Sequence, residues 1–322
     1  MASSKKAIYA AIAGNGAIAV TKFFGAAISG SSAMLAEGIH SLVDTGNGGL
    51  LLLGLRRSQR PPDDAHPYGY GKTVYFYALI VAVLIFGLGG GISLYEGILH
   101  TLHPSPPETG GATILGISMS GLTLNTVVLS AAIVFEAGAF WTAWTEFSAM
   151  RGDTPLMEAI RTSKDPTTFT VLFEDTAAIA GLVVALAGVH AAHAFQMPIF
   201  DGIASIVIGL ILCGVASLLV WESKKLIIGE AADTELRTDV RTIAEADSGV
   251  EAVGRLLTLH MGPNTLIVNM DLQFSSSLDA AAVEATIDRV EQAIRAAHNE
   301  VTYIFLEAES LTPRARTSAP EA

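Results

Sequence analysis

The chain has 322 residues, of which 51% are hydrophobic and 16% are charged, and its formal net charge is −12. A typical soluble domain carries roughly 25% charged residues, so this composition excludes an ordinary water-soluble protein. The single cysteine, Cys213, also excludes an intramolecular disulfide and a metal cluster held by several thiolates of one chain.

Six apolar segments are long enough to cross the roughly 30 Å hydrocarbon core of a bilayer. They cover residues 7–28, 33–56, 73–99, 122–146, 168–190 and 200–221. The first segment follows two lysines and has some features of a signal peptide. It is too long for one and five further spans follow, so we expect it to remain as a helix.

Basic residues alternate between the segments that connect these spans. Lysine and arginine occur before span one, between spans two and three, between spans four and five, and after span six. The other three connections contain neither residue type. The positive-inside rule therefore predicts that both termini are cytoplasmic, and the regular alternation supports the number of six spans.

The composition changes after Lys225. Residues 226–322 contain 16 acidic and 7 basic residues, a net charge of −9, which indicates a soluble acidic domain. Periodicity predicts a helix over 234–246, strands over 253–259 and 266–274, a helix through Val283 and Ile294, and a strand over 302–306.

The expected fold class is therefore a membrane α-helical protein with six transmembrane helices, followed by a cytoplasmic α+β domain of ferredoxin-like αββαβ order. We expect a transmembrane domain over 1–225, a dimerisation or regulatory domain over 226–312, and a disordered tail over 313–322.

Two pairs of polar residues interrupt the apolar spans. His40 and Asp44 stand four residues apart in span two, so both side chains project from one face of a helix. Glu174 and Asp175 lie in span five. Ionisable groups cost several kcal/mol in hydrocarbon, so they are expected to face the interior of the bundle and to be functional. Together the two pairs predict a divalent-metal site.

These residues occur within a wider pattern: "SSAMLAEGIHSLVDTG" in span two, "DDAHPYGYGK" in the following loop, and an acidic span five. With six spans and an αββαβ domain, the chain resembles the cation diffusion facilitator family of metal/proton antiporters. The resemblance implies a homodimer and a tetrahedral transport site with two ligands each from spans two and five. On span two these positions are His40 and Asp44.

Span five departs from the family pattern, which commonly places His or Asp four residues before an Asp. Four residues before Asp175 stands Val171, which cannot bind metal. Glu174, a water molecule, Asn47 or another group could complete the site. Glu174 could equally form an ion pair with Lys22 of span one, which itself needs a partner in the membrane.

The resemblance also implies a second metal site in the loop after span two. Its ligands would be Asp63 or Asp64, His66 and a third position, which Tyr70 occupies in this chain. Tyrosine is a poor zinc ligand at neutral pH, so we expect a weak site or none. Glu136 in span four belongs to no motif, and we interpret it as a helix-packing contact rather than a relay group.

Imidazole and carboxylate groups bind either Zn²⁺ or protons, so one site can carry metal out and protons back. We predict a secondary active transporter that exports divalent metal cations by alternating access. Zn²⁺ is the first candidate, with Mn²⁺, Co²⁺, Cd²⁺ and Fe²⁺ as alternatives. The metal is cargo, protons are the counter-ion, and no cofactor is expected.

The expected partners are a second copy of the chain, divalent ions and the lipid bilayer, with no nucleic acid. A compact chain without a transit peptide suits a bacterial inner membrane. The alternatives are a metal-dependent intramembrane enzyme and a membrane receptor or scaffold. The sequence has no recognisable catalytic motif such as HExxH, which argues against an enzyme. It also has no P-loop, which argues against a primary pump.

Overall fold

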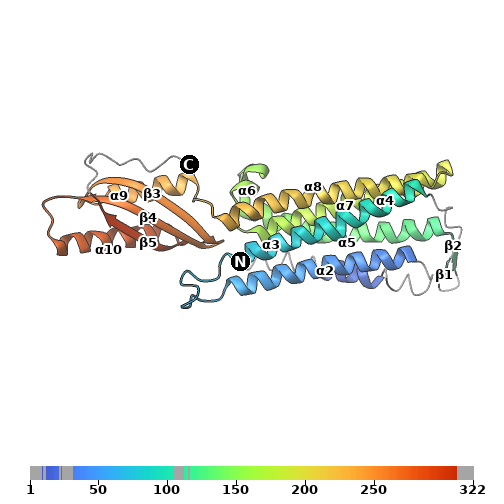
Figure 1. Cartoon of the computed structure of the whole chain (residues 1–322), viewed down its shortest axis with the longest axis horizontal. Helices are drawn as coiled ribbons and strands as arrows, with labels where there is room; N and C mark the ends of the chain where they lie inside the picture. Colours follow the sequence, from blue (N-terminus) through green and yellow to red (C-terminus); the bar gives the residue numbers. More distant parts are fainter. Residues whose placement is uncertain are drawn as a thin grey trace. The chain divides into compact units, whose positions relative to one another are not determined.

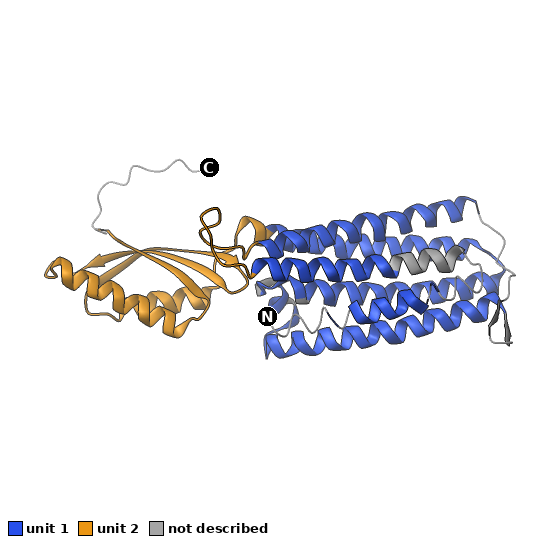
Figure 2. Ribbon diagram, turned by 90° about the horizontal axis from the view of Figure 1, so that it is seen from below, with its two compact units in different colours: residues 1–58, 73–224 blue, residues 59–72, 225–322 orange. Residues whose placement is uncertain are grey.

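The computed structural model describes residues 9, 12–21, 23, 32–103, 112–114 and 117–309. Within these ranges it does not describe the side chains of 32–40, 112–114, 117–119, 157, 161, 162 and 168. The chain divides into two compact units, residues 1–58 with 73–224 and residues 59–72 with 225–322 (Figure 2). The tail expected over 313–322 lies outside the described residues.

The first unit, here called the helix unit, is built from long helices that run alongside one another (Figure 1). They are the helical residues Ile12–Thr21, α2 (Ser32–Ser58), α3 (Thr73–Leu84), η1 (Ile85–Gly91), α4 (Ile92–Leu102), α5 (Gly121–Arg151), α7 (Pro166–Phe195) and α8 (Ile199–Ile228). A short helix α6 (Leu156–Thr162) and an antiparallel pair of strands, β1 (Ala112–Ile114) and β2 (Ile117–Met119), lie in the connections.

Six helical segments thus lie where the six spans are predicted, because α3, η1 and α4 form one continuous helix over Thr73–Leu102. In the described part of the chain, four helices are long and apolar enough to cross a membrane: Thr73–Leu102, Gly121–Arg151, Phe169–Phe195 and Ile199–Ile228. The 27-residue α2 is less apolar because it carries the polar residues of the predicted site and two terminal arginines.

Local sequence explains where two of these helices begin. The side chain of Ser120 accepts a hydrogen bond from the Thr123 amide and caps α5. Asp165 caps α7 by accepting from the Thr167 amide, and Pro166 occupies the first turn, where its missing N–H leaves no hydrogen bond unmade. Helix α7 therefore starts at a defined residue, which fixes the positions of Glu174 and Asp175 about two turns later.

The second unit, here called the soluble unit, has the predicted order of helix, hairpin, helix and strand, and this prediction is confirmed. Its elements are α9 (Thr234–Glu245), β3 (Val250–Gly262), β4 (Thr265–Phe274), α10 (Ala280–Ala297) and β5 (Val301–Ala308). The strand order is β3-β4-β5, with β3 antiparallel and β5 parallel to β4. Strand β3 is longer than predicted because irregularities in its register with β4 interrupt the alternation that the sequence pattern requires.

The core of the soluble unit lies between the sheet and its two helices. Every second residue of β4 is buried and packs against α9 and α10. The residues that fill this layer are Leu266, Val268, Met270 and Leu272 from β4, Val240 and Ala244 from α9, and Val290 and Ile294 from α10. The opposite face of the sheet carries Leu257 and Phe305, which are 51% and 47% exposed.

The loop over residues 59–72 belongs to the soluble unit rather than to the helices that it connects. Tyr303 donates a 3.5 Å hydrogen bond to the Pro67 carbonyl, and Lys72 Nζ donates one of 3.3 Å to the Ile227 carbonyl. A Cβ atom at Gly71 would lie 2.3 Å from the carbonyl oxygen of Met261, so only glycine permits this approach.

Candidate metal centre

Polar side chains from four helical segments line one cavity of about 30 Å³ inside the helix unit. A site for one water molecule needs roughly 10–15 Å³, so the cavity can hold an ion with little of its hydration shell. The polar residues around it are Asn15, Asp44, Asn47, Glu136, Glu174 and Asp175. Apolar side chains from α2, α7 and α8 and the turn where α3 meets η1 complete the wall.

Helices α2 and α7 are linked directly at this cavity. Asn47 Nδ2 on α2 donates a 3.0 Å hydrogen bond to Glu174 Oε1 on α7. Asp44 lies about one turn before Asn47 on α2 and also lines the cavity. Glu174 and Asp175 are separated by about 100° around their helix, yet both contribute to the cavity wall.

The structure therefore brings together four of the residues singled out in the sequence: Asp44, Asn47, Glu174 and Asp175. His40 belongs to α2, but its side chain lies outside the described part of the structure. Lys22 lies outside the described residues altogether. The carboxylate of Glu174 has Asn47 as its hydrogen-bond partner, with the amide as donor.

Two further polar residues at the cavity were not predicted. Glu136 of α5 is buried and lines the cavity, a position that its interpretation as a helix-packing contact did not predict. Asn15 of the first helical segment is buried in the same wall. Each is a polar residue within a predominantly apolar span, which is the one sequence signal that could have indicated both.

The cavity has a strongly negative set of side chains. Four carboxylates from three helices surround it, and the lining residues that the structure describes include no lysine or arginine. Glu174 repels both Asp44 and Asp175, and Asp175 repels Glu136. Among the described residues no three His, Cys, Asp or Glu side chains are grouped tightly enough to form a closed metal shell. The carboxylates instead surround a space that a cation or protons would neutralise.

The loop residues Asp63, His66 and Tyr70 form a small hydrogen-bonded group in the soluble unit. Tyr70 donates a 2.6 Å hydrogen bond to Asp63 Oδ2, while Asp63 Oδ1 accepts from the His66 amide at 2.7 Å. The hydrogen bond from Tyr70, followed by that from the His66 amide, lowers the pKa of Asp63. The hydrogen bond between Tyr70 and Asp63 also raises the pKa of Tyr70. The rings of His66 and Tyr70 lie 4.2 Å apart, and Asp64 is exposed.

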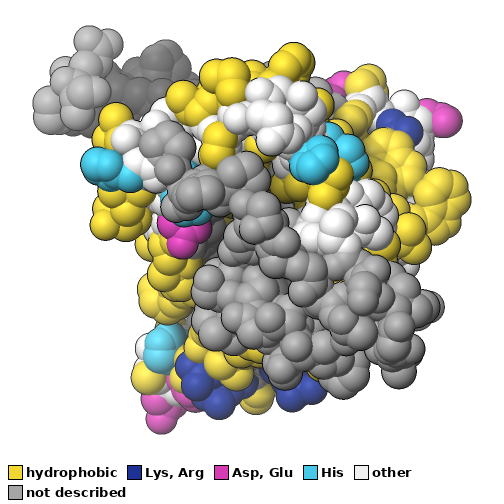
Figure 3. All heavy atoms as spheres, turned by 90° about the vertical axis from the view of Figure 1, so that its right-hand side faces the viewer, with side chains coloured by type: hydrophobic (Ala, Val, Ile, Leu, Met, Phe, Trp, Pro, Cys, Tyr) yellow, Lys and Arg dark blue, Asp and Glu magenta, His cyan; other side chains and the backbone are white. Residues whose placement is uncertain are grey.

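Histidine side chains also lie among hydrophobic side chains at one end of the helix unit (Figure 3). At the end of α4, His100 Nδ1 lies 3.8 Å from Asp201 Oδ2 in the first turn of α8. Both side chains are about half exposed, so this contact differs from the cavity with its buried carboxylates and contributes little to stability.

A bundle of long apolar helices around a carboxylate-lined cavity, with an αββαβ unit after it, defines an integral membrane protein of the cation-transporting type. Family models agree with both parts. Residues 8–228 match the cation efflux transmembrane domain, and residues 232–310 match the cytoplasmic domain of cation efflux proteins. The chain belongs to the cation diffusion facilitator family, a family of transporters.

Similar proteins occur in animals, plants and bacteria. The chain is 31% identical over 271 residues to the mouse (Mus musculus) proton-coupled zinc antiporter SLC30A9, mitochondrial, which covers 84% of this chain and 46% of that one. It is 33% identical to metal tolerance protein C4 of Arabidopsis thaliana, covering 78% and 52% of the two chains. It is 26% identical to the cation-efflux pump FieF of Klebsiella pneumoniae, covering 90% and 87%. The chain thus spans about half the length of the mouse and Arabidopsis proteins.

Proposed function

We propose that this protein is a secondary active transporter that exports divalent metal cations from the cytoplasm in exchange for protons by alternating access. One observation carries the proposal: Asp44, Glu136, Glu174 and Asp175 converge on one cavity inside the helix unit whose described lining has no basic residue. Such a set of carboxylates is stable within a membrane protein when a divalent cation or protons neutralise it.

Zn²⁺ is the proposed cargo, and Mn²⁺, Co²⁺, Cd²⁺ and Fe²⁺ are the alternatives. Support for zinc and protons comes from the mouse relative, whose name describes a proton-coupled zinc antiporter. In the proposed transport site, His40, Asp44 and Asp175 bind the ion, and Glu174 or Asn47 completes the set. Glu174 and Asn47 are suited to this role because their hydrogen bond already joins α2 and α7.

The proposed location is a bacterial inner membrane with both termini in the cytoplasm. The alternation of loops with and without lysine or arginine supports this orientation. We further propose that the protein is a homodimer and that the soluble unit contributes to its interface. The match to the cytoplasmic domain of cation efflux proteins supports this assignment, and the open sheet face with Leu257 and Phe305 is the proposed surface.

Transport into proteoliposomes under an imposed pH gradient tests this function. We expect the native chain to accumulate Zn²⁺ in a proton-dependent manner, while Asp44→Ala and Asp175→Ala lower the initial rate by at least about tenfold, because each removes a ligand from the cavity. Rates with Mn²⁺, Co²⁺, Cd²⁺ and Fe²⁺ rank the alternative ions. Simultaneous recording of internal pH determines whether protons leave as the metal enters.

Glu96→Ala is the matched control, since Glu96 lies on α4, is exposed and is absent from the cavity wall. This variant removes a carboxylate from the same unit and should transport at the native rate. Equal rates for all three variants and the native chain would contradict the proposed site. Absence of transport of every metal by the native chain would contradict the proposed function.

A further inference from the structure

Three oxygen atoms at the cavity have no hydrogen-bond partner among the described residues: Asn15 Oδ1, Asn47 Oδ1 and Asp175 Oδ2. Their side chains are 5%, 1% and 2% exposed, and all three residues line the cavity. A buried amide or carboxylate oxygen without a partner costs free energy in a folded protein. Three such oxygens around one space indicate a ligand that accepts their lone pairs, which is the behaviour of a cation.

The neighbours of Asn15 contact two other helices. A Cβ atom at Gly14 would lie 3.6 Å from Ala139 Cβ, so this part of the first helical segment contacts α5. On the other side, a Cβ atom at Gly48 would lie 2.6 Å from Ile12 Cγ1, so the same segment contacts α2. Asn15 is thereby held between two helices that both carry cavity carboxylates.

The chemistry of Asn15 differs from that of the acidic residues. An amide oxygen is a neutral, hard ligand that cannot be removed by protonation at physiological pH. Oxygen ligands of this kind suit Mn²⁺ and similar cations, whereas zinc sites mostly use histidine and cysteine with some carboxylates. With Asn47 and Asp175, Asn15 shifts the donor set of the cavity towards oxygen.

We propose that Asn15 is a specificity-determining ligand of this cavity. Its Oδ1 binds the transported cation together with Asn47 Oδ1 and Asp175 Oδ2, and raises the transport of Mn²⁺ relative to Zn²⁺. This inference rests on the proposed transport function and adds a ligand from a third helical segment to a site predicted on α2 and α7.

The test compares Mn²⁺ and Zn²⁺ transport by Asn15→Leu, Asn15→Ala and Asn15→Asp in proteoliposomes. Leucine has the same number of side-chain heavy atoms but no oxygen, alanine avoids any crowding, and aspartate retains the oxygen. We expect the Mn²⁺/Zn²⁺ rate ratio to fall about tenfold in the leucine and alanine variants and to stay near the native value in the aspartate variant. Asn125→Leu, a change of the same kind at an exposed position of α5, should leave the ratio unchanged.

A second measurement does not depend on transport. The rise in thermal stability that Mn²⁺ produces in the full-length protein in detergent should disappear in Asn15→Leu and Asn15→Ala and persist in Asn15→Asp, because a bound ligand stabilises the folded state. If the native chain transports Zn²⁺ while the ratio and the Mn²⁺ shift are unaltered in both oxygen-free variants, the inference about Asn15 is wrong and the transport function stands. If the native chain moves no metal, the proposed function itself fails.

Discussion

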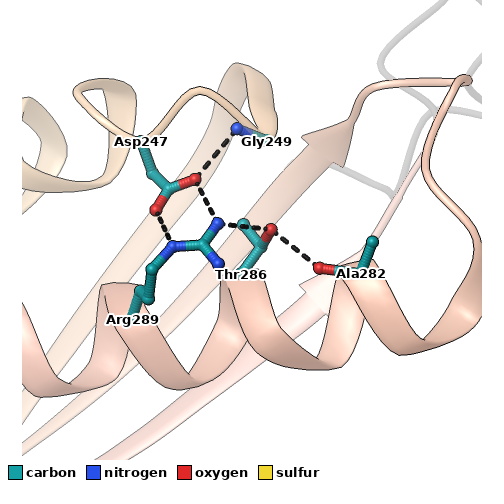
Figure 4. A network of polar contacts seen from close by, with 5 residues as sticks. All are labelled: Asp247, Gly249, Ala282, Thr286 and Arg289. Atoms are coloured by element: carbon teal, nitrogen blue, oxygen red, sulfur yellow. Dashed lines mark hydrogen bonds and ion pairs between the residues drawn. The ribbon is translucent and has the colours of Figure 1, made fainter.

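Individual hydrogen bonds fix the geometry of the soluble unit where α9 ends and α10 passes it. Arg289 donates from Nε to Asp247 Oδ2 at 2.8 Å and from Nη2 to Oδ1 at 2.9 Å, and Asp247 also accepts from the Gly249 amide (Figure 4). Arg289 additionally reaches Thr286 on its own helix. The guanidinium of Arg289 lowers the pKa of Asp247, so the folded state favours the ionised carboxylate.

Acidification should therefore destabilise the soluble unit in a defined pH range. Because the pKa of Asp247 is lower in the folded state, its contribution is complete above the ordinary value of about 4 and is lost as the pH falls through the lowered value. We expect Asp247→Asn to lower the unfolding temperature of the full-length protein by a few degrees at pH 7. The difference from the native chain should shrink below about pH 4 in thermal unfolding curves.

The comparison has a simple control. Asp239→Asn changes an exposed aspartate of α9 whose Oδ2 lies 3.8 Å from His298 Nε2, and it should leave the unfolding temperature nearly unaltered. A native-minus-variant difference for Asp247 that stays constant from pH 7 to pH 3 would contradict the assigned role of this ion pair.

Among the helices, the continuous helix Thr73–Leu102 and α8 approach each other with glycine at the contacts. A Cβ atom at Gly97 would lie 2.8 Å from the Gly202 carbonyl oxygen, and one at Gly209 would lie 2.8 Å from the Leu94 amide nitrogen. Backbone atoms of the two helices therefore meet where side chains are absent. The π-helical turn η1 lies in the same helix, beside the cavity.

Adding one methyl group at this contact should weaken the packing of the helix Thr73–Leu102 against α8. Gly209→Ala places a Cβ atom against backbone that cannot move aside, and we expect a loss of about 1–3 kcal/mol in stability and a lower unfolding temperature in detergent. Gly214→Ala, on the same helix, meets nothing within 4 Å and should be neutral or slightly stabilising. Equal effects of the two changes would show that the close approach is not required.

The assembly of the whole protein can be tested at the open face of the soluble sheet. Leu257 and Phe305 both lie opposite Asn269 in the strand register, so an exposed apolar side chain flanks Asn269 on each outer strand of the sheet. A second copy of the chain is the proposed partner for this surface. In a symmetric dimer the same sheet face of each copy packs against the other, so both copies bury Leu257 and Phe305.

We expect Phe305→Asp to shift the detergent-solubilised protein from dimer towards monomer in light scattering, because a charge would be buried in the interface. Thr238→Asp adds the same charge at an exposed position of α9 and should leave the dimer intact. A dimer of unaltered stability in Phe305→Asp would place the interface elsewhere on the molecule.

Much of this architecture could be predicted from local patterns in the sequence. Runs of apolar residues indicate the spans because a bilayer imposes a minimum helix length, and the alternation along β4 indicates a strand with one buried face. The polar residues of α2 and α7 were found because charge within a span is costly. Strand β3 was predicted too short, since an irregular register leaves no clear period in the sequence.

The sequence by itself determined the helical segments, the αββαβ order and the candidates Asp44, Glu174 and Asp175, because these follow from composition and spacing along one element. The tertiary structure decided which polar residues share a cavity, adding Asn15 and Glu136 from helical segments with no motif. It also decided that the loop over 59–72 packs with the soluble unit. Such associations depend on contacts between residues far apart in the chain, which local periodicity does not encode.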